Sequence, residues 1–205
     1  MAPEFTIIVP TIREKKFAEL KSSIENSCAG MSYELIPRSD DGGSLEGIRQ
    51  GYKLAQGKYI IFMPDDVFMC LNALQSMKKF MESNEGLFIA AFSVNSEPPD
   101  SSPMYFSRRF ARYPCMSREN IELIGGLIRD GYHHFYGDAD LSLRVWEAGG
   151  KFLLNDESQV LPNGSINYDE VYCNSYDRYY ELDRNLFQQH WQKYGEVPME
   201  NHLKP

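Results

Sequence analysis

The segment KYIIFMPDDV, Lys58–Val67, indicates which class of fold this chain adopts. Its apolar residues form a continuous run from Tyr59 to Met63, with no polar residue alternating between them. A strand with that pattern is buried on both faces, which is typical of a parallel sheet covered by helices on each side. Pro64 ends the run, and two carboxylates, Asp65 and Asp66, follow directly. The pair needs an explanation, because adjacent like charges repel each other.

Strand-like and helix-like segments alternate along the first half of the chain. Further strands are predicted at residues 5–10, 33–37 and 86–94, and helices at 14–28, 45–57 and 70–82. This alternation predicts an α/β fold: a single Rossmann-like domain with a mostly parallel central sheet and helices on both faces.

Local patterns refine the predicted helices. Thr11 and Glu14 form the T-x-x-E pattern of a capping box, and Gly57 is suited to be a C-cap. In the helix at 70–82 we expect the apolar side chains to face the core; these are Leu71, Leu74, Met77 and Met81.

The pattern changes after Val94. A Pro- and Ser-rich loop precedes a basic patch, Arg108, Arg109 and Arg112, and a short helix is expected behind Ser117, a good N-cap residue. A longer helix starts at Asp138, and a last strand follows at 151–155. We predict one domain over residues 1–165, with a first half at about 1–95 and a second half at about 104–165. Residues 166–205 form a helical tail, expected to pack on the domain through Leu182, Leu186, Phe187, Trp191 and Tyr194.

Composition excludes several classes of function. The chain has 205 residues, a net charge of −8 and 42% hydrophobic residues, enough for one substantial core. A protein that reads the phosphate backbone of nucleic acid normally has a basic face, so we expect no nucleic-acid partner. The sequence shows no signal peptide and no apolar run of transmembrane length, which predicts a cytoplasmic protein and leaves peripheral attachment to a membrane open. The four cysteines are widely spaced and are expected to be reduced thiols.

Polar clusters follow three of the predicted strands, at the edge where ligands bind in such sheets. Acids in the position of Asp65 and Asp66 often cap the next helix, but capping explains one acid better than two. A bound Mg²⁺ or Mn²⁺ bridging to a diphosphate offsets both charges. We therefore predict a divalent metal site here. Asp40 and Asp41, followed by two glycines, fit a turn and a nucleotide-binding loop equally well.

The segment GDADLSLR, residues 137–144, holds further acids. Asp138 at the helix start is suited to be a cap, and also a general base if a cleft faces it; an ordinary aspartate, with a pKa of about 3.9, is already ionised at neutral pH. Asp140 is expected to pair with Arg144 four residues later. For His133 and His134 we favour a loop or core role, and for at least two of the three arginines of the basic patch a solvated face.

The order of these pieces resembles the family 2 nucleotide-diphospho-sugar glycosyltransferases, which have the GT-A fold. The resemblance covers roughly residues 5–164 and rests on FTIIVPTIRE, GIRQGYKLAQGKYIIFMPDDV, SRENIELIGG and FYGDADLSLRVWEAGGKF. It implies that Asp66 is the metal-side acid of a D-x-D motif, that Asp65 holds the middle position and that Pro64 replaces the first acid. It also implies that Asp138 is the catalytic base, with Gly137 in place of the usual Glu.

The same resemblance implies that the half at about 1–95 is the nucleotide-sugar half and the half at about 104–165 is the acceptor half. It also implies the remaining site residues. Pro10, Thr11 and Arg13 would line the nucleotide pocket, and Asp40 or Asp41 would lie near the base. The family's late histidine would fall near Pro162 or Asn163, where this chain has none, and Arg49 replaces a common Asn.

The implied reaction is metal-assisted transfer of a sugar, with inversion, from a nucleotide-diphospho-sugar to a hydroxyl of a glycan or a lipid-linked sugar, as in glycan or polysaccharide biosynthesis. Two alternatives stay open. A sugar-1-phosphate nucleotidyltransferase would also have acidic metal ligands, although the segment TIREKK lacks the glycines such an enzyme needs. An inactive nucleotide-sugar-binding module of the same fold is the other.

Overall fold

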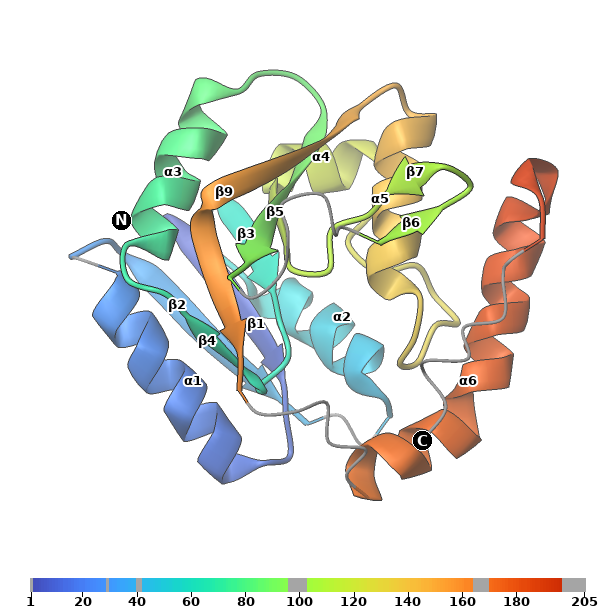
Figure 1. Cartoon of the computed structure of the whole chain (residues 1–205), viewed down its shortest axis with the longest axis horizontal. Helices are drawn as coiled ribbons and strands as arrows, with labels where there is room; N and C mark the ends of the chain where they lie inside the picture. Colours follow the sequence, from blue (N-terminus) through green and yellow to red (C-terminus); the bar gives the residue numbers. More distant parts are fainter. Residues whose placement is uncertain (1, 29, 40–41, 96–102, 164–169, 197–205) are drawn as a thin grey trace.

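A computed structural model of the chain describes residues 2–28, 30–39, 42–95, 103–163 and 170–196, and is shown in Figure 1. Its central sheet has seven strands in the order β2-β1-β3-β8-β5-β9-β4, and a small second sheet pairs β6 with β7. The strands are β1 (Phe5–Pro10), β2 (Tyr33–Arg38), β3 (Tyr59–Phe62), β4 (Val67–Met69), β5 (Phe88–Val94), β6 (Met104–Tyr105), β7 (Arg108–Arg109), β8 (Pro114–Ser117) and β9 (Lys151–Pro162). The helices are α1 (Glu14–Ser27), α2 (Ser44–Leu54), α3 (Ala73–Ser83), α4 (Arg118–Leu123), α5 (Gly137–Glu147) and α6 (Glu170–Trp191), followed by a 3₁₀ turn at Gln192–Tyr194.

The central sheet is mostly parallel, as predicted. β2, β1 and β3 pair in parallel, and so do β5 and β9. β8 is antiparallel to both β3 and β5, so these two groups of strands run in the same direction, while β4 runs against β9. The apolar run that suggested a doubly buried strand is indeed buried along all of β3.

Helices cover both faces of this sheet, which confirms the predicted class. Residues of α1 and α3 pack with Phe5, Ile7 and Val9 of β1 in one core. On the other face Ile8 belongs to a second core with residues of α2, α4, α5 and α6. Figure 1 shows α1 and α3 on one side of the sheet and α2, α5 and α6 on the other.

Several local predictions were wrong because tertiary partners override the local pattern. Thr11 is not the N-cap of α1. The helix begins at Glu14, its N-cap is Arg13, and no side chain bonds its first turn as a cap. Gly57 is not a C-cap, because α2 ends at Leu54. Instead Gly57 passes so close to β1 that a Cβ there would lie 2.4 Å from the backbone nitrogen of Thr6.

Three side chains that were expected to pack inward are exposed, among them Tyr194 at 36%. Leu71 is 74% exposed because it precedes α3, whereas Leu74, Met77 and Met81 are buried as expected. Leu182 on α6 is 58% exposed, while Phe187 and Trp191 on the same helix are fully buried. Strands β4 and β8 and the β6–β7 hairpin were not predicted. Ser117 does cap α4, accepting a bond of 3.2 Å from the amide of Asn120.

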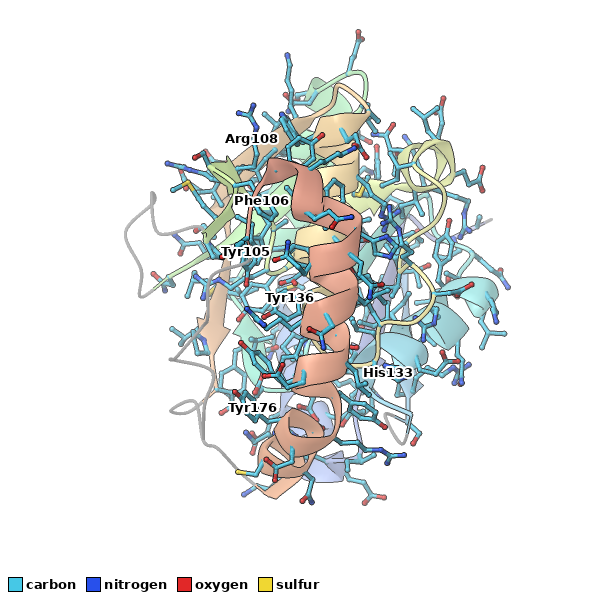
Figure 2. All side chains as sticks on the ribbon, turned by 90° about the vertical axis from the view of Figure 1, so that its right-hand side faces the viewer. Tyr105, Phe106, Arg108, His133, Tyr136 and Tyr176 are labelled. Atoms are coloured by element: carbon cyan, nitrogen blue, oxygen red, sulfur yellow. The ribbon has the colours of Figure 1, made fainter. Side chains whose placement is uncertain are left out.

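The C-terminal helix α6 lies along the face of the molecule opposite α1 and α3 (Figure 1). Figure 2 looks onto this helix, which carries Tyr176, with Tyr105 and Tyr136 beside it. The ring of Tyr136 stacks on Phe187 of α6 at 4.8 Å. Over the residues described, the chain contains no helix with the length and apolar character that crossing a bilayer requires. The domain boundary at residue 165 stays a prediction.

Candidate active site

Asp65 lies at the carboxyl end of β3 and is held by residues that follow β1. Its side chain is 1% exposed. One carboxylate oxygen accepts from the hydroxyl of Thr11 at 2.5 Å and from Nε of Arg13 at 3.1 Å, and the other accepts from a terminal nitrogen of Arg13. Both oxygens therefore have charged or polar donors, which offsets the cost of burying this carboxylate.

Asp66 has a different environment from its neighbour. Its side chain is 44% exposed, and its nearest cation is Arg13 at 3.7 Å. Partial burial raises the pKa of this carboxyl above its usual value, although the charge of Arg13 acts in the opposite direction. The backbone oxygen of Asp66 accepts from the amide of Asn163 at 2.7 Å. Asn163, near which the resemblance places a histidine, therefore does lie beside Asp66, but its carboxamide donates to Glu19.

A divalent metal fits this edge through a single protein carboxylate. The carboxylate of Asp66 is accessible to solvent, whereas that of Asp65 is engaged in hydrogen bonds from Thr11 and Arg13. In the described part of the chain, no three His, Cys, Asp or Glu side chains are grouped closely enough to hold a metal. Mg²⁺ and similar hard ions are commonly bound by one or two carboxylates, with phosphate oxygens and water completing the shell. The residues present thus suit an ion that arrives with a diphosphate.

The loop before α5 joins this edge to the second half of the chain. His134 shares a hydrogen bond of 3.1 Å with the hydroxyl of Ser44 at the start of α2. The carbonyl of His133 accepts from the amide of Leu45 at 2.9 Å. Burial lowers the pKa of His134 to about 4, and the positive charge of Arg13 contributes to this shift. His134 is therefore neutral near pH 7 and lies within the electrostatic reach of Arg13.

Two further contacts fix the same loop against α2. A Cβ at Gly137 would lie 2.5 Å from a methyl carbon of Leu45, so any side chain here requires Leu45 to move. Arg49 of α2 donates to the carbonyls of Arg129 and Tyr132, at 3.0 and 2.9 Å.

Asp138 lies in the first turn of α5, whose N-cap is Tyr136 at a φ of 64°. One carboxylate oxygen accepts from the amide of Ala139 at 2.8 Å. Burial raises the pKa of Asp138 to about 6; the bond from Ala139 and the positive charge of Arg112 lower it in part. The expectation of an ordinary pKa near 3.9 was therefore wrong. The cause is desolvation, which disfavours the charged form.

The segment that carries Arg112 is attached directly to the start of α5. The amide of Ala111 donates to the hydroxyl of Ser142 at 3.0 Å, and that hydroxyl donates to the carbonyl of Asp138 at 2.8 Å. Arg108 of the basic patch lies elsewhere. It is exposed, and its guanidinium lies over the ring of Trp146, 4.3 Å from the ring centroid.

Asp140 is part of the core rather than of the site, as predicted. It is 1% exposed and accepts from Nε of Arg144 at 2.9 Å and from the indole of Trp191 at 3.0 Å. The guanidinium of Arg144 also donates to the carbonyls of Ile124, Gly126 and Leu127.

The structure thus brings together most of the predicted site residues that it describes. Pro10 is the buried last residue of β1 and directly precedes Thr11, which with Arg13 bonds Asp65. Asp40 and Asp41 lie outside the described residues. Sequence reasoning did not select Ser44, and it gave His134 no site role. The Gly-Gly pair before Ser44 could have pointed to a helix start at this edge.

Comparisons with known proteins agree on the fold. No family model and no curated protein sequence matches this chain. Among solved structures, S. aureus TarS aligns with 98% of this chain and 41% of its own, at a TM-score of 0.64 and 12% identity. A mannosyltransferase from Pyrobaculum calidifontis, in complex with GDP-Man and Mn²⁺, is also similar, at a TM-score of 0.61 and 11% identity. The alignment covers 97% of this chain and 66% of the mannosyltransferase.

The catalytic domain of Drosophila β1,4-galactosyltransferase 7, in complex with xylobiose, is also similar. It covers 74% of this chain and 64% of its own, at a TM-score of 0.57 and 14% identity. The chain therefore spans less than two thirds of each of these three proteins. At such identities the likeness concerns the fold alone, and it shows that this chain has the GT-A fold of glycosyltransferase domains.

Proposed function

We propose that this chain is an inverting glycosyltransferase of family 2, which moves a sugar from a nucleotide-diphospho-sugar to an acceptor hydroxyl. The observation that carries the proposal is the environment of Asp138. Burial raises the pKa of its carboxyl group to about 6. The group lies at the start of α5, and the preceding loop is hydrogen-bonded to Ser44 and Leu45 at the sheet edge that holds Asp65 and Asp66. A base with a pKa near the working pH can accept a proton at little cost, which is the property this reaction needs.

The donor would bind at the carboxyl ends of β1, β2 and β3. Pro10, Thr11 and Arg13 would line the nucleotide pocket, with Asp40 or Asp41 near the base. Arg13 brings positive charge to the same edge and is fixed in place by its bonds to Asp65. In this arrangement Asp65 serves to orient Thr11 and Arg13.

Asp66 would hold a divalent ion, Mn²⁺ or Mg²⁺, that accompanies the diphosphate. When bound, such an ion neutralises negative charge that develops on the departing phosphate oxygen. Two similar proteins support this assignment: the mannosyltransferase complex contains Mn²⁺, and a mutant of the Drosophila galactosyltransferase was crystallised with manganese, UDP-Gal and xylobiose.

The chemistry is a single displacement. The acceptor oxygen attacks the anomeric carbon while the bond from that carbon to the diphosphate oxygen breaks, and the bonding electrons leave with the nucleoside diphosphate. The acceptor loses its proton to the carboxylate of Asp138. Because attack occurs opposite the leaving group, the configuration of the anomeric carbon inverts. The acceptor would be a glycan or a lipid-linked sugar.

Single-turnover transfer by wild type and Asp138→Asn tests the proposal. A screen of UDP- and GDP-sugars with Mn²⁺ first identifies the donor by release of nucleoside diphosphate. Asn keeps the shape of the side chain but cannot take the proton, so transfer should fall by about 10²–10⁴-fold. Donor affinity should stay close to that of wild type. Equal transfer rates for the two proteins would remove Asp138 from the mechanism.

One observation favours a second candidate, an inactive nucleotide-sugar-binding module. Pro64 stands in place of an acid, and Asp65 is fully engaged by Thr11 and Arg13, which leaves Asp66 as the accessible acid of the pair. Such a module would bind a nucleotide-sugar with Mn²⁺ but release no nucleoside diphosphate with any acceptor.

A further inference from the structure

A buried carboxylate on α6 binds the loop that leads to Asp138. The side chain of Asp183 is fully buried. One of its oxygens accepts from the amide of His133 at 2.9 Å and is 3.2 Å from Nδ1 of the same residue. The other oxygen accepts from the amides of His134 and Phe135 at 2.7 and 2.8 Å. Three successive backbone amides thus converge on one carboxylate, an arrangement in which a chain segment surrounds an anion.

The same three residues are attached to α2 on their other side. The carbonyl of His133 accepts from the amide of Leu45, and His134 bonds the hydroxyl of Ser44. The ring of His133 also stacks on that of Tyr179, which lies one turn before Asp183 on α6. The ring centroids are 4.9 Å apart and the angle between the ring planes is 4°. Figure 2 shows His133 beside this helix. Residues 133–135 are therefore held between α6 and the N-terminus of α2.

The position of this segment decides where Asp138 lies. Tyr136 follows directly, adopts a positive φ of 64° and forms the N-cap of α5. Positive φ is uncommon for a residue other than glycine and persists only where the surroundings fix it. Two residues later comes Asp138. A change in the direction of the backbone at 133–135 would therefore move the start of α5.

A role in packing alone does not account for the residue type. An apolar side chain would fill the same space but would leave the amides of residues 133–135 without an acceptor. Only an acceptor with two oxygens can fix the direction of three neighbouring amides at once. The carboxylate is thus suited to orientation.

We propose that Asp183 is a positioning residue for the transfer reaction, fixing residues 133–135 between α6 and α2 and thereby setting the place of both His134 and Asp138. This inference rests on the proposed function. It gives α6, which lies beyond residues 5–164 that carry the sequence resemblance, a part in supporting the active site. Asp183 itself does not contact substrate; it acts through the loop.

The test compares Asp183→Asn with Asp140→Asn in the full chain. Asn at 183 turns an NH₂ group toward the backbone amides, so part of the clamp is lost. Asp140→Asn is the matched control, since it removes the charge of another buried carboxylate that contacts α6, through Trp191. Both variants should unfold at lower temperature. At a temperature where circular dichroism shows each one folded, kcat should fall by about 10- to 100-fold in Asp183→Asn, because small misplacements of reacting groups have effects of that size.

Two kinetic outcomes separate positioning from stability. The KM for donor should change by less than about threefold in Asp183→Asn, and kcat of Asp140→Asn should stay within about twofold of wild type. Equal losses of kcat in the two variants, or an unchanged kcat in Asp183→Asn, would overturn the proposal.

Amide hydrogen exchange provides a measurement that needs neither a folded variant nor a known donor. In the wild-type chain the amides of residues 133–135 should exchange as slowly as those of β1, since all three are hydrogen-bonded to a fully buried carboxylate. Fast exchange at these three amides would overturn the clamp whatever the variants do. If wild type transfers no sugar with any donor, the proposed function fails, and slow exchange at 133–135 then assigns Asp183 a structural role only.

Discussion

Replacing Asp138 by Asn should make the protein more stable at alkaline pH while it abolishes transfer. In the folded chain burial raises the pKa of Asp138 from 3.8 to about 6. The folded state therefore binds this proton more tightly than the unfolded state. Stability is highest below the unfolded pKa, falls as pH rises from about 4 to about 6, and is constant above that. A difference of about two pKa units corresponds to roughly 3 kcal/mol in the free energy of unfolding.

Asn cannot ionise, so the variant does not lose this free energy. At pH 8 Asp138→Asn should be more stable than wild type by up to about 3 kcal/mol, or roughly 6–12 °C in melting temperature for a chain of this size. At pH 4 the difference should shrink to under about 1 kcal/mol, because both side chains are then largely uncharged. The favourable bond from Ala139 and the charge of Arg112 are already contained in the shifted pKa.

Thermal unfolding of both proteins at pH 4, 6 and 8, followed by circular dichroism, measures this effect. Asp140→Asn serves as a control, since its partner Arg144 stays charged at each of these values. The reasoning would be refuted if the difference in melting temperature between Asp138→Asn and wild type were the same at all three pH values. It would also fail if the variant were less stable than wild type at pH 8.

Three further predictions follow from the same structure. The single-turnover rate of wild-type transfer should rise about tenfold per pH unit below pH 6 and level off above it, as Asp138 ionises; a flat profile from pH 5 to pH 8 would exclude it as the base. UDP or GDP should raise the melting temperature more with Mn²⁺ than with EDTA, and Asp66→Asn should abolish the difference; a full metal-dependent shift in that variant would contradict the assignment. Asp140→Asn should lower the free energy of unfolding in urea by about 3 kcal/mol, because Arg144 keeps a buried charge without its carboxylate; a loss below about 1 kcal/mol would show that the ion pair contributes little.

The sequence predicts those parts of the fold whose signal is local. Strands β1, β3 and β5 are largely apolar, β2 has apolar residues on both sides of Glu34, and the helices between them show a clear apolar face, so these elements were predictable. Strands β4 and β8 are three and four residues long and pair antiparallel with strands far away in the chain. Nothing in such short segments distinguishes a strand from a loop, because pairing partners define them.

The candidate site shows the same division between local and tertiary signals. The types of residue at the strand ends could be read from the sequence, but their partners could not. Thr11 matched a capping box, yet its hydroxyl donates to Asp65, 54 residues away. The raised pKa of Asp138 depends on burial by segments distant in sequence, and the role of Asp183 depends on where α6 packs. Short-range patterns contain no information about either.

The hydrogen bonds of four carboxylates, those of Asp65, Asp138, Asp140 and Asp183, support the proposal that Asp138 is the base. Asp65 accepts from a hydroxyl and a guanidinium, Asp140 from a guanidinium and an indole, and Asp183 from three amides. Each of these sets of donors occupies both oxygens, which suits a structural role. Asp138 is held by backbone amides at its own helix start, including that of Ala139, and its charged form is disfavoured. A carboxylate that folding leaves under-solvated gains most from taking a proton. For that reason we expect Asp138, and not the better-bonded acids, to accept a proton from a substrate.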